Sequence, residues 1–306
     1  MRRDIHLIGA PMDYGADRRG VDMGTSAIRY AGLAGVLEDA GNSCTDLGDL
    51  TIPRAEERDP DAKQPAAGNA KFLREVEDVS TQVADSVAAT LEDGSFPLVL
   101  GGDHSIAIGS MAGSSRNADL GVIWFDAHAD LNTPETSPSG NVHGMPLAAV
   151  LGRGEFSEYE WAYAPRVREE SIVYVGLRSI DDRERELVHE SEMTAFTMSD
   201  IDERGITAVV EDALEVATTG TDGIHVSLDL DWLDPKEAPG VGTPVRGGVT
   251  YREAHTALEL VSKRDAQNDV LRSMDVVEVN PILDEQNETA KLAVELTASA
   301  FGKRIL

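Results

Sequence analysis

Three features are scarce in this sequence: cysteine, long hydrophobic runs and lysine, of which there are only six. Cys44 is the only cysteine among 306 residues, which excludes an intrachain disulfide and a zinc site built from several thiolates. No apolar run approaches the roughly 20 residues needed to cross a bilayer, so no membrane association is expected. The first residues lead straight into a strand-like segment and lack the cleavage site of a signal peptide. These absences favour a cytoplasmic location.

The charge is strongly one-sided. The chain has 27 basic and 55 acidic residues, which gives a formal net charge of −28. A surface this negative is unsuited to binding nucleic acid. One interpretation is that the acidic surface only aids solubility. We favour a halophilic protein, adapted to high salt, in which screening removes the self-repulsion and the fold loosens when salt is withdrawn.

Strand-like and helix-like segments alternate along the chain, which is typical of an α/β fold with a mostly parallel sheet between two layers of helices. The predicted strands are short apolar runs: Asp4–Ala10, Pro97–Leu100, Gly121–Phe125, Ser171–Gly176, Gly223–Leu230 and Ser273–Val279. The predicted helices are Ser26–Ala40, Asn69–Glu92, Ser199–Ala217, Thr250–Arg264 and Asn287–Lys303. The charged, proline-containing stretch Arg54–Gly68 is interpreted as a surface loop. No linker or repeat divides the chain, so we expect one domain over residues 1–306.

Five predicted strands run directly into polar residues at their carboxyl ends. These ends begin at Gly101, Asp126, Arg178, Asp229 and Glu278. Ligands of open α/β sheets bind at the carboxyl ends of the strands. Polar residues at a single strand end are explained by ordinary turn chemistry, but five such ends of this composition indicate a site.

The sequences Asp126-Ala127-His128-Ala129-Asp130 and Asp229-Leu230-Asp231 stand out among these ends. Side chains alternate faces along a strand, so the acidic and histidine side chains of each stretch are expected to share a face. His104 adds a second imidazole from a neighbouring strand end. Four or more carboxylates in one place repel each other unless cations neutralise them. Each aspartate alone is explained as a turn former or helix cap, but the six together predict a metal site.

The predicted ligands, His104, Asp126, His128, Asp130, Asp229 and Asp231, form an oxygen-rich set that favours Mn²⁺, although Zn²⁺, Co²⁺ and Fe²⁺ remain open. Carboxylates bridge ions, so six residues suffice for two ions about 3.5–4 Å apart. Such a pair lowers the pKa of a bound water from 15.7 towards about 7, which makes metal-assisted hydrolysis the expected reaction class.

Three of these regions together resemble the signatures of the ureohydrolase (arginase/agmatinase) family. They are Gly101–Ser105, Asp126–Asp130 and Ser227–Pro235. The resemblance covers nearly the whole chain, from Gly9–Met12 and Arg18–Gly24 through Gly242–Val245 and Gly247–Glu253 to Glu278–Pro281, and is greatest to bacterial and archaeal arginases. It implies a three-layer α/β/α fold with a central sheet of eight strands. It also implies a binuclear manganese centre, with His104 and Asp130 on one ion, His128 and Asp231 on the other, and Asp126 and Asp229 between them.

The substrate is decided elsewhere in this family. Residues 132–144 resemble the arginase loop around the amino-acid end of arginine, where Asn132, Ser139 and Asn141 would donate hydrogen bonds to the α-carboxylate. Asp181 matches the aspartate that meets the α-ammonium. Agmatine lacks the carboxylate, so the resemblance favours L-arginine as substrate. Ser179 stands where some arginases carry a second aspartate.

The resemblance also implies a mechanism, in which a metal-bridging hydroxide attacks the guanidinium carbon and yields L-ornithine and urea. Glu278 would hold the guanidinium group, and Asp130 would orient the hydroxide and accept a proton. His143 is the predicted proton shuttle, because imidazole titrates near neutral pH. Thr243 would line the pocket. The family further implies a homotrimer or homohexamer.

Two alternatives remain open at this point. One is an agmatinase or another guanidino-compound ureohydrolase, which would share the metal centre and differ in the loop 132–143. The other is a catalytically silent metal-binding scaffold. The remaining histidines, including His225, are predicted to have structural roles, and Asp103 is predicted to be a cap or a support for His104 rather than a ligand.

Overall fold

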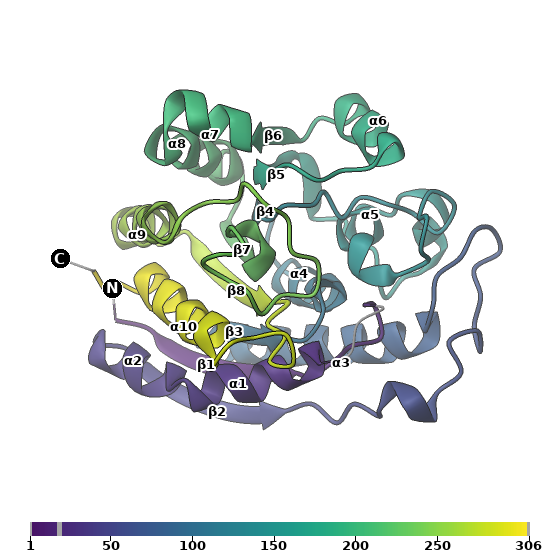
Figure 1. Ribbon diagram of the computed structural model, residues 1–306, viewed down its shortest axis with the longest axis horizontal. Coiled ribbons are helices and arrows are strands. Elements are labelled where there is room, and N and C mark those ends of the chain that lie inside the picture. Colours follow the sequence, from purple (N-terminus) through teal and green to yellow (C-terminus); the bar gives the residue numbers. More distant parts are fainter. Residues whose placement is uncertain (1, 17–19, 305–306) are drawn as a thin grey trace.

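The computed structural model describes residues 2–16 and 20–304. It contains one sheet of eight strands, all parallel, in the order β2-β1-β3-β8-β7-β4-β5-β6 (Figure 1). The strands are β1 (Asp4–Ala10), β2 (Ser43–Asp49), β3 (Phe96–Gly101), β4 (Leu120–Phe125), β5 (Val167–Leu177), β6 (Thr194–Thr197), β7 (Gly223–Asp229) and β8 (Leu271–Val277). The prediction of an eight-stranded, mostly parallel sheet is confirmed. Arg18 and Arg19, part of one sequence motif, lie outside the described residues.

Helices cover both faces of the sheet, and alternate side chains of β4 enter different cores. On β4, Ile123 and Phe125 pack in one core, while Val122 and Trp124 pack in the other. The first core is completed by α1 (Gly24–Tyr30), α2 (Leu33–Asp39), α7 (Met198–Arg204), α8 (Ile206–Thr218), α9 (Tyr251–Asn268) and α10 (Glu288–Ala300). The second is completed by α3 (Leu73–Glu92), α4 (Ala107–Ser114) and α5 (Pro146–Val150). The fold therefore has three layers, α/β/α.

The sequence did not predict every element. The helix expected over Ser26–Ala40 is two helices, because the chain turns at Gly32 with a φ of 92°. The helix expected over Ser199–Ala217 is likewise divided into α7 and α8 at Gly205, whose φ is 78°. Strands β2 and β6 and helices α4, α5 and α6 (Asp182–Glu190) were not predicted. The stretch Arg54–Gly68 is irregular apart from a short 3₁₀ turn at Ala55–Glu57, as expected for a loop. Among the described residues, no helix is long and apolar enough to cross a membrane.

The four central strands end at the same level. Their register aligns Leu100 of β3, Val276 of β8, Leu228 of β7 and Phe125 of β4 in one row across the sheet. The residues that follow this row are the ones that carry the sequence signatures. The sheet order therefore brings together chain segments that lie far apart in the sequence.

Candidate metal centre

Three of the strand ends have the same local structure, built on an aspartate. The Oδ1 atom of Asp126 accepts the backbone N–H of His128 at 2.7 Å. Asp229 Oδ1 accepts the N–H of Asp231 at 2.7 Å, and Asp103 Oδ1 accepts the N–H of Ser105 at 3.0 Å. An aspartate that bonds the N–H two residues on stabilises a tight turn. Each of these aspartates thus ends its strand with one oxygen and keeps the other for a further contact.

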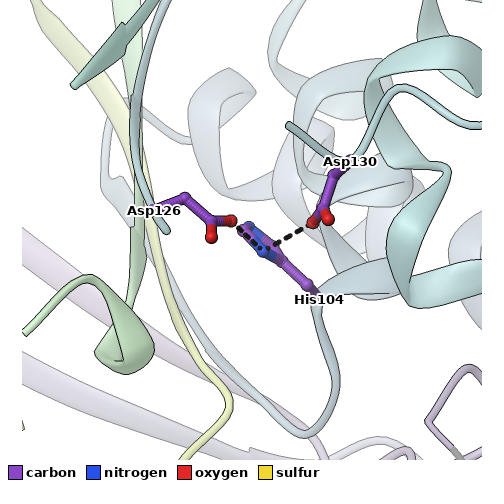
Figure 2. A group of neighbouring side chains, drawn as sticks. All are labelled: His104, Asp126 and Asp130. Carbon is purple, nitrogen blue, oxygen red and sulfur yellow. Dashed lines mark ion pairs between the residues drawn. The ribbon is translucent and has the colours of Figure 1, made fainter. Parts of the chain in front are cut away.

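His104 lies at the centre of the first group of side chains. Its Nδ1 atom is 3.1 Å from one carboxylate oxygen each of Asp126, Asp130 and Asp229. Figure 2 shows Asp126 and Asp130 on opposite sides of the imidazole ring, with both carboxylates directed towards it. Trp124 stacks on the ring with centroids 4.1 Å apart and an interplanar angle of 5°, which fixes the plane of the imidazole.

A second group lies beside the first and shares Asp126 with it. His128 Nδ1 is 3.0 Å from Asp231 Oδ2 and 3.5 Å from Asp126 Oδ1. All six predicted ligands are therefore brought together, as two sets, His104–Asp126–Asp130 and Asp126–His128–Asp231, with Asp229 against His104.

The six side chains converge for a reason other than the strand alternation that the sequence predicts. Strand alternation was expected to align Asp126, His128 and Asp130, but β4 ends at Phe125. The three side chains converge because the chain bends after the strand and Asp130 adopts a φ of 49°. Similarly, Asp229 is the last residue of β7, while Asp231 lies in the 3₁₀ turn Leu230–Trp232.

Burial and mutual repulsion shift the titration of these groups. Burial, with repulsion from neighbouring aspartates, raises the pKa of Asp229 well above its ordinary value and that of Asp130 to about 6. Burial opposes the ionised form of Asp126 as well, but its close approach to His104 and His128 keeps its pKa below the usual range. Burial also opposes the charged form of both histidines, yet the carboxylates around them raise their pKa values well above the usual one. The cluster buries four carboxylates with only two imidazoles, and a bound cation would stabilise the ionised carboxylates.

The donor set also fits metal ions in its spacing. His104 Nδ1 and Asp126 Oδ2 are buried and have no hydrogen-bond partner, although they lie 3.1 Å apart, because the geometry of a hydrogen bond is not met. Ligand atoms that share one octahedral ion at bond lengths of about 2.1 Å lie about 3 Å apart. Oxygen-rich sets of this kind with two imidazoles suit divalent ions such as Mn²⁺.

Glu278 and His143 lie at the edge of the cluster. Glu278 Oε1 accepts the backbone N–H of His104 at 3.0 Å and lies 3.2 Å from His143 Nδ1. The other oxygen, Oε2, is buried without a hydrogen-bond partner. A side chain on Gly242 would come within 3.0 Å of that oxygen, so glycine keeps the space beside it open. Burial opposes the charged form of His143, but the bond to Glu278 and its charge raise the pKa of His143 to about 9.

Two of the residues expected around the amino-acid end of a substrate, Asn132 and Asp181, are hydrogen-bonded to each other. Asn132 Nδ2 donates to Asp181 Oδ2 at 2.9 Å. The other oxygen of Asp181 caps α6 by accepting the N–H groups of Arg183 and Glu184 at 2.8 and 2.9 Å. Thr243 donates its hydroxyl to Asp231 Oδ2 at 2.9 Å. Thr243 thus contacts a predicted ligand directly.

Ser139 and Asn141 lie further along the same loop. The Ser139 hydroxyl accepts the N–H of Asn141 at 3.1 Å. Lys71, which the sequence did not indicate, donates its Nζ to Asn141 Oδ1 at 3.0 Å. Because an ammonium group only donates, it fixes the amide of Asn141 with its nitrogen free to donate elsewhere.

Two further side chains position the site and were missed in the sequence. Glu184 is buried and accepts the N–H of Leu131, next to Asp130, at 3.1 Å. Arg178 donates to the carbonyls of Asp231 at 2.6 Å and Val245 at 2.9 Å, and so joins the end of β5 to two segments of the site. In the sequence, Arg178 stands at the carboxyl end of a predicted strand and Glu184 stands three residues after Asp181, the spacing of a helix capping box. Neither signal distinguishes a positioning role from a solvated charge.

The comparisons with known proteins agree with this geometry. Residues 3–302 match the model of the arginase family. The chain is 50% identical to the arginase of Bacillus subtilis over the full length of both chains. It superposes on the crystal structure of Bacillus caldovelox arginase with a TM-score of 0.91 and 47% identity, covering 99% of this chain and 100% of that one. It superposes on the crystal structure of Entamoeba histolytica arginase in complex with L-ornithine with a TM-score of 0.86 and 34% identity, covering 99% of this chain and 100% of that one. The chain therefore belongs to the arginase family of hydrolases.

Proposed function

We propose that this protein hydrolyses L-arginine to L-ornithine and urea at two Mn²⁺ ions bound by the cluster. The observation that carries the proposal is the buried, unpartnered Oε2 of Glu278, an acceptor beside the cluster that suits a guanidinium donor. A related enzyme, that of Entamoeba histolytica, was crystallised with L-ornithine, the product expected here.

The six side chains would hold the ions in two sets that share Asp126. His104 and Asp130 would bind one ion, His128 and Asp231 the other, with Asp126 and Asp229 between them. Bound divalent ions supply Lewis-acid activation of a water molecule at neutral pH. Mn²⁺ is proposed rather than Zn²⁺ because carboxylate oxygens outnumber nitrogens in the set.

The protein's own residues would position and protonate the substrate. The Glu278 carboxylate would hold the guanidinium group by a charge-assisted hydrogen bond, worth about 1.5–3 kcal/mol. Asp130 would orient the attacking water and accept its proton. His143, partly exposed at the edge of the cluster, would deliver a proton to the departing amine of ornithine.

The loop 132–141 would select L-arginine over agmatine. Asn132, Ser139 and Asn141 would donate to the α-carboxylate, and Asp181 would accept from the α-ammonium. The orientation of the Asn141 amide supports this assignment, because Lys71 occupies its oxygen and leaves its nitrogen to donate.

The larger-scale expectations are proposals of the same kind. We propose a single catalytic domain over residues 1–306, supported by one continuous sheet and a family match over residues 3–302. The family resemblance leads us to expect a homotrimer or homohexamer, which light scattering at high salt will test. The cytoplasmic location and the halophilic character remain predictions from composition.

The test is urea release by manganese-loaded protein in molar KCl, with L-arginine and agmatine compared side by side. Turnover of arginine that falls in Asn132→Ala and Ser139→Ala supports the proposal. Turnover of agmatine alone would keep the metal centre and overturn the substrate. Two bound ions without hydrolysis of any guanidino compound would indicate a silent scaffold.

A further inference from the structure

A chain of buried hydrogen bonds leads from His104 away from the cluster and into the sheet. His104 Nε2 is 2.7 Å from Ser227 Oγ, which is 2.6 Å from Asp275 Oδ1. Asp275 Oδ2 is 3.1 Å from His225 Nε2, and His225 Nδ1 is 2.8 Å from Ser273 Oγ. Each of the five side chains is at most 1% exposed. The pairing of β7 with β8 sets His225 opposite Ser273 and Ser227 opposite Asp275, so the sheet register itself builds the chain.

The direction of these hydrogen bonds follows from the chemistry of Asp275. An ionised carboxylate only accepts, so Ser227 donates its single hydroxyl proton to Asp275. The hydroxyl oxygen of Ser227 must then accept from His104, which places a proton on Nε2 of that ring. The Nδ1 atom of His104 therefore has a free lone pair in the metal-binding form, and it faces Asp126, Asp130 and Asp229.

His225 holds Asp275 in the ionised, accepting state. Burial alone opposes the charge of this carboxyl, yet the contact with His225 lowers the pKa of Asp275 below its ordinary value. Among the described residues that face Asp275, the polar contacts are His225 and Ser227, one to each of its oxygens. Both oxygens are thus occupied by donors that cannot be exchanged without breaking the chain.

We infer that Asp275 and His225 are positioning residues, which fix the hydrogen-bond direction at Ser227 so that His104 presents an unprotonated Nδ1 to the metal centre. The inference rests on the metal centre proposed above. Stacking on Trp124 fixes the plane of the ring but not which nitrogen carries the proton. The Asp275–His225 pair determines which nitrogen of His104 carries the proton, although neither residue contacts the metal-binding cluster directly.

The alternative is that the buried polar chain only stabilises the sheet. A purely structural role predicts a loss of folding stability with no preference between the two ions. The positioning role predicts a selective loss at the ion bound by His104, because only that ion depends on the free Nδ1. The two roles are therefore separated by measuring the sites individually.

The decisive variant is Asp275→Asn. An amide has one accepting oxygen where the carboxylate has two, so either Ser227 or His225 loses its acceptor. The matched control is Asp265→Asn, which alters another buried aspartate that accepts the N–H of Leu271 at the opposite end of β8. Ser227→Ala, with Ser227→Thr as its conservative rescue, is the second test if Asp275→Asn does not fold.

Mn²⁺ is titrated into chelator-treated protein by calorimetry and electron paramagnetic resonance. We expect two ions in the wild type. In Asp275→Asn we expect one site weakened by roughly 10–100-fold, the usual effect of losing a partner of a metal-bound histidine, and the other within threefold. In zinc-loaded protein, the hydrogen-bonded Nε2 proton of His104 is expected in the proton NMR spectrum of the wild type and of Asp265→Asn, and absent from Asp275→Asn and Ser227→Ala.

Equal weakening of both sites, or the same change in Asp265→Asn, would overturn the inference and leave the metal centre intact. So would a wild-type protein that binds two ions and lacks the Nε2 proton. A wild-type protein that binds no divalent ion would overturn the metal centre and this inference together.

Discussion

Replacing Glu278 by glutamine separates its two oxygens experimentally. Glutamine keeps an oxygen that accepts the N–H of His104, so the turn after β3 is expected to survive. The amide nitrogen then stands in place of the unpartnered Oε2. A guanidinium group, which only donates, would meet another donor there.

The expected loss follows from the strength of the lost bond. A hydrogen bond between charged partners contributes about 1.5–3 kcal/mol, and each 1.4 kcal/mol is tenfold in rate. The kcat/KM for arginine should therefore fall by roughly 10–150-fold in Glu278→Gln. The substitution also removes the group that raises the pKa of His143, so that pKa should fall from about 9 towards the ordinary value of histidine.

The assay combines urea release with an NMR titration of His143. Glu75→Gln is the matched control, because Glu75 is another buried glutamate with an unpartnered Oε2, lies in α3 and is not one of the predicted site residues. An arginine kcat/KM within twofold of wild type in Glu278→Gln would refute the role of Oε2 as guanidinium acceptor. An unchanged pKa of His143 would refute the contact with Glu278 as its cause.

Three further predictions concern metal, charge and salt. Without bound metal, folding stability should fall as the pH rises from about 4 through 6. Burial and the charge of Asp126 raise the pKa of Asp130 to about 6, so in this range the folded chain keeps a proton that the unfolded chain has released. Calorimetry should show this slope only in the chelated protein, and equal slopes with and without Mn²⁺ would contradict the prediction. Lys71→Met should raise the KM for L-arginine roughly three- to tenfold, because Asn141 loses the donor that orients its amide, and should leave agmatine turnover unaffected; a parallel loss with agmatine would mean that Lys71 only holds the loop. The melting temperature should rise between 0.05 and 2 M KCl, because the net charge of −28 is screened; an equal rise in isosmotic sucrose would attribute the effect to solute exclusion instead.

The inner part of the sheet was predictable from the sequence, and its edges were not. Strands β3, β4, β7 and β8 are fully or almost fully buried, so their apolar runs have no other explanation than burial on both faces. The edge strand β2 has the sequence Ser43-Cys44-Thr45-Asp46-Leu47-Gly48-Asp49 and is largely exposed. Its pairing with β1, rather than its composition, makes it a strand. The local sequence of β2 does not predict that pairing.

The residues that gather at the site were predictable from the sequence, but the residues that position them were not. Parallel strands place their carboxyl ends at one edge, so polar residues there gather whatever the strand order. The contact of His225 with Asp275 depends instead on the register of two strands about 50 residues apart in the chain. In sequence, His225 is one histidine within an apolar run. The prediction of a structural, buried histidine is confirmed, but the sequence did not indicate its contact with Asp275.

The two explanations of the strand-end aspartates, turn former and metal ligand, proved compatible because a carboxylate has two oxygens. Asp126 and Asp229 each use Oδ1 to close the turn and direct Oδ2 towards His104. The turn fixes the rotation of the carboxylate, so the second oxygen is oriented before any cation arrives. A site assembled in this way needs little rearrangement to bind metal, and an aspartate followed by a turn at the end of a buried strand favours a ligand as much as it favours a loop.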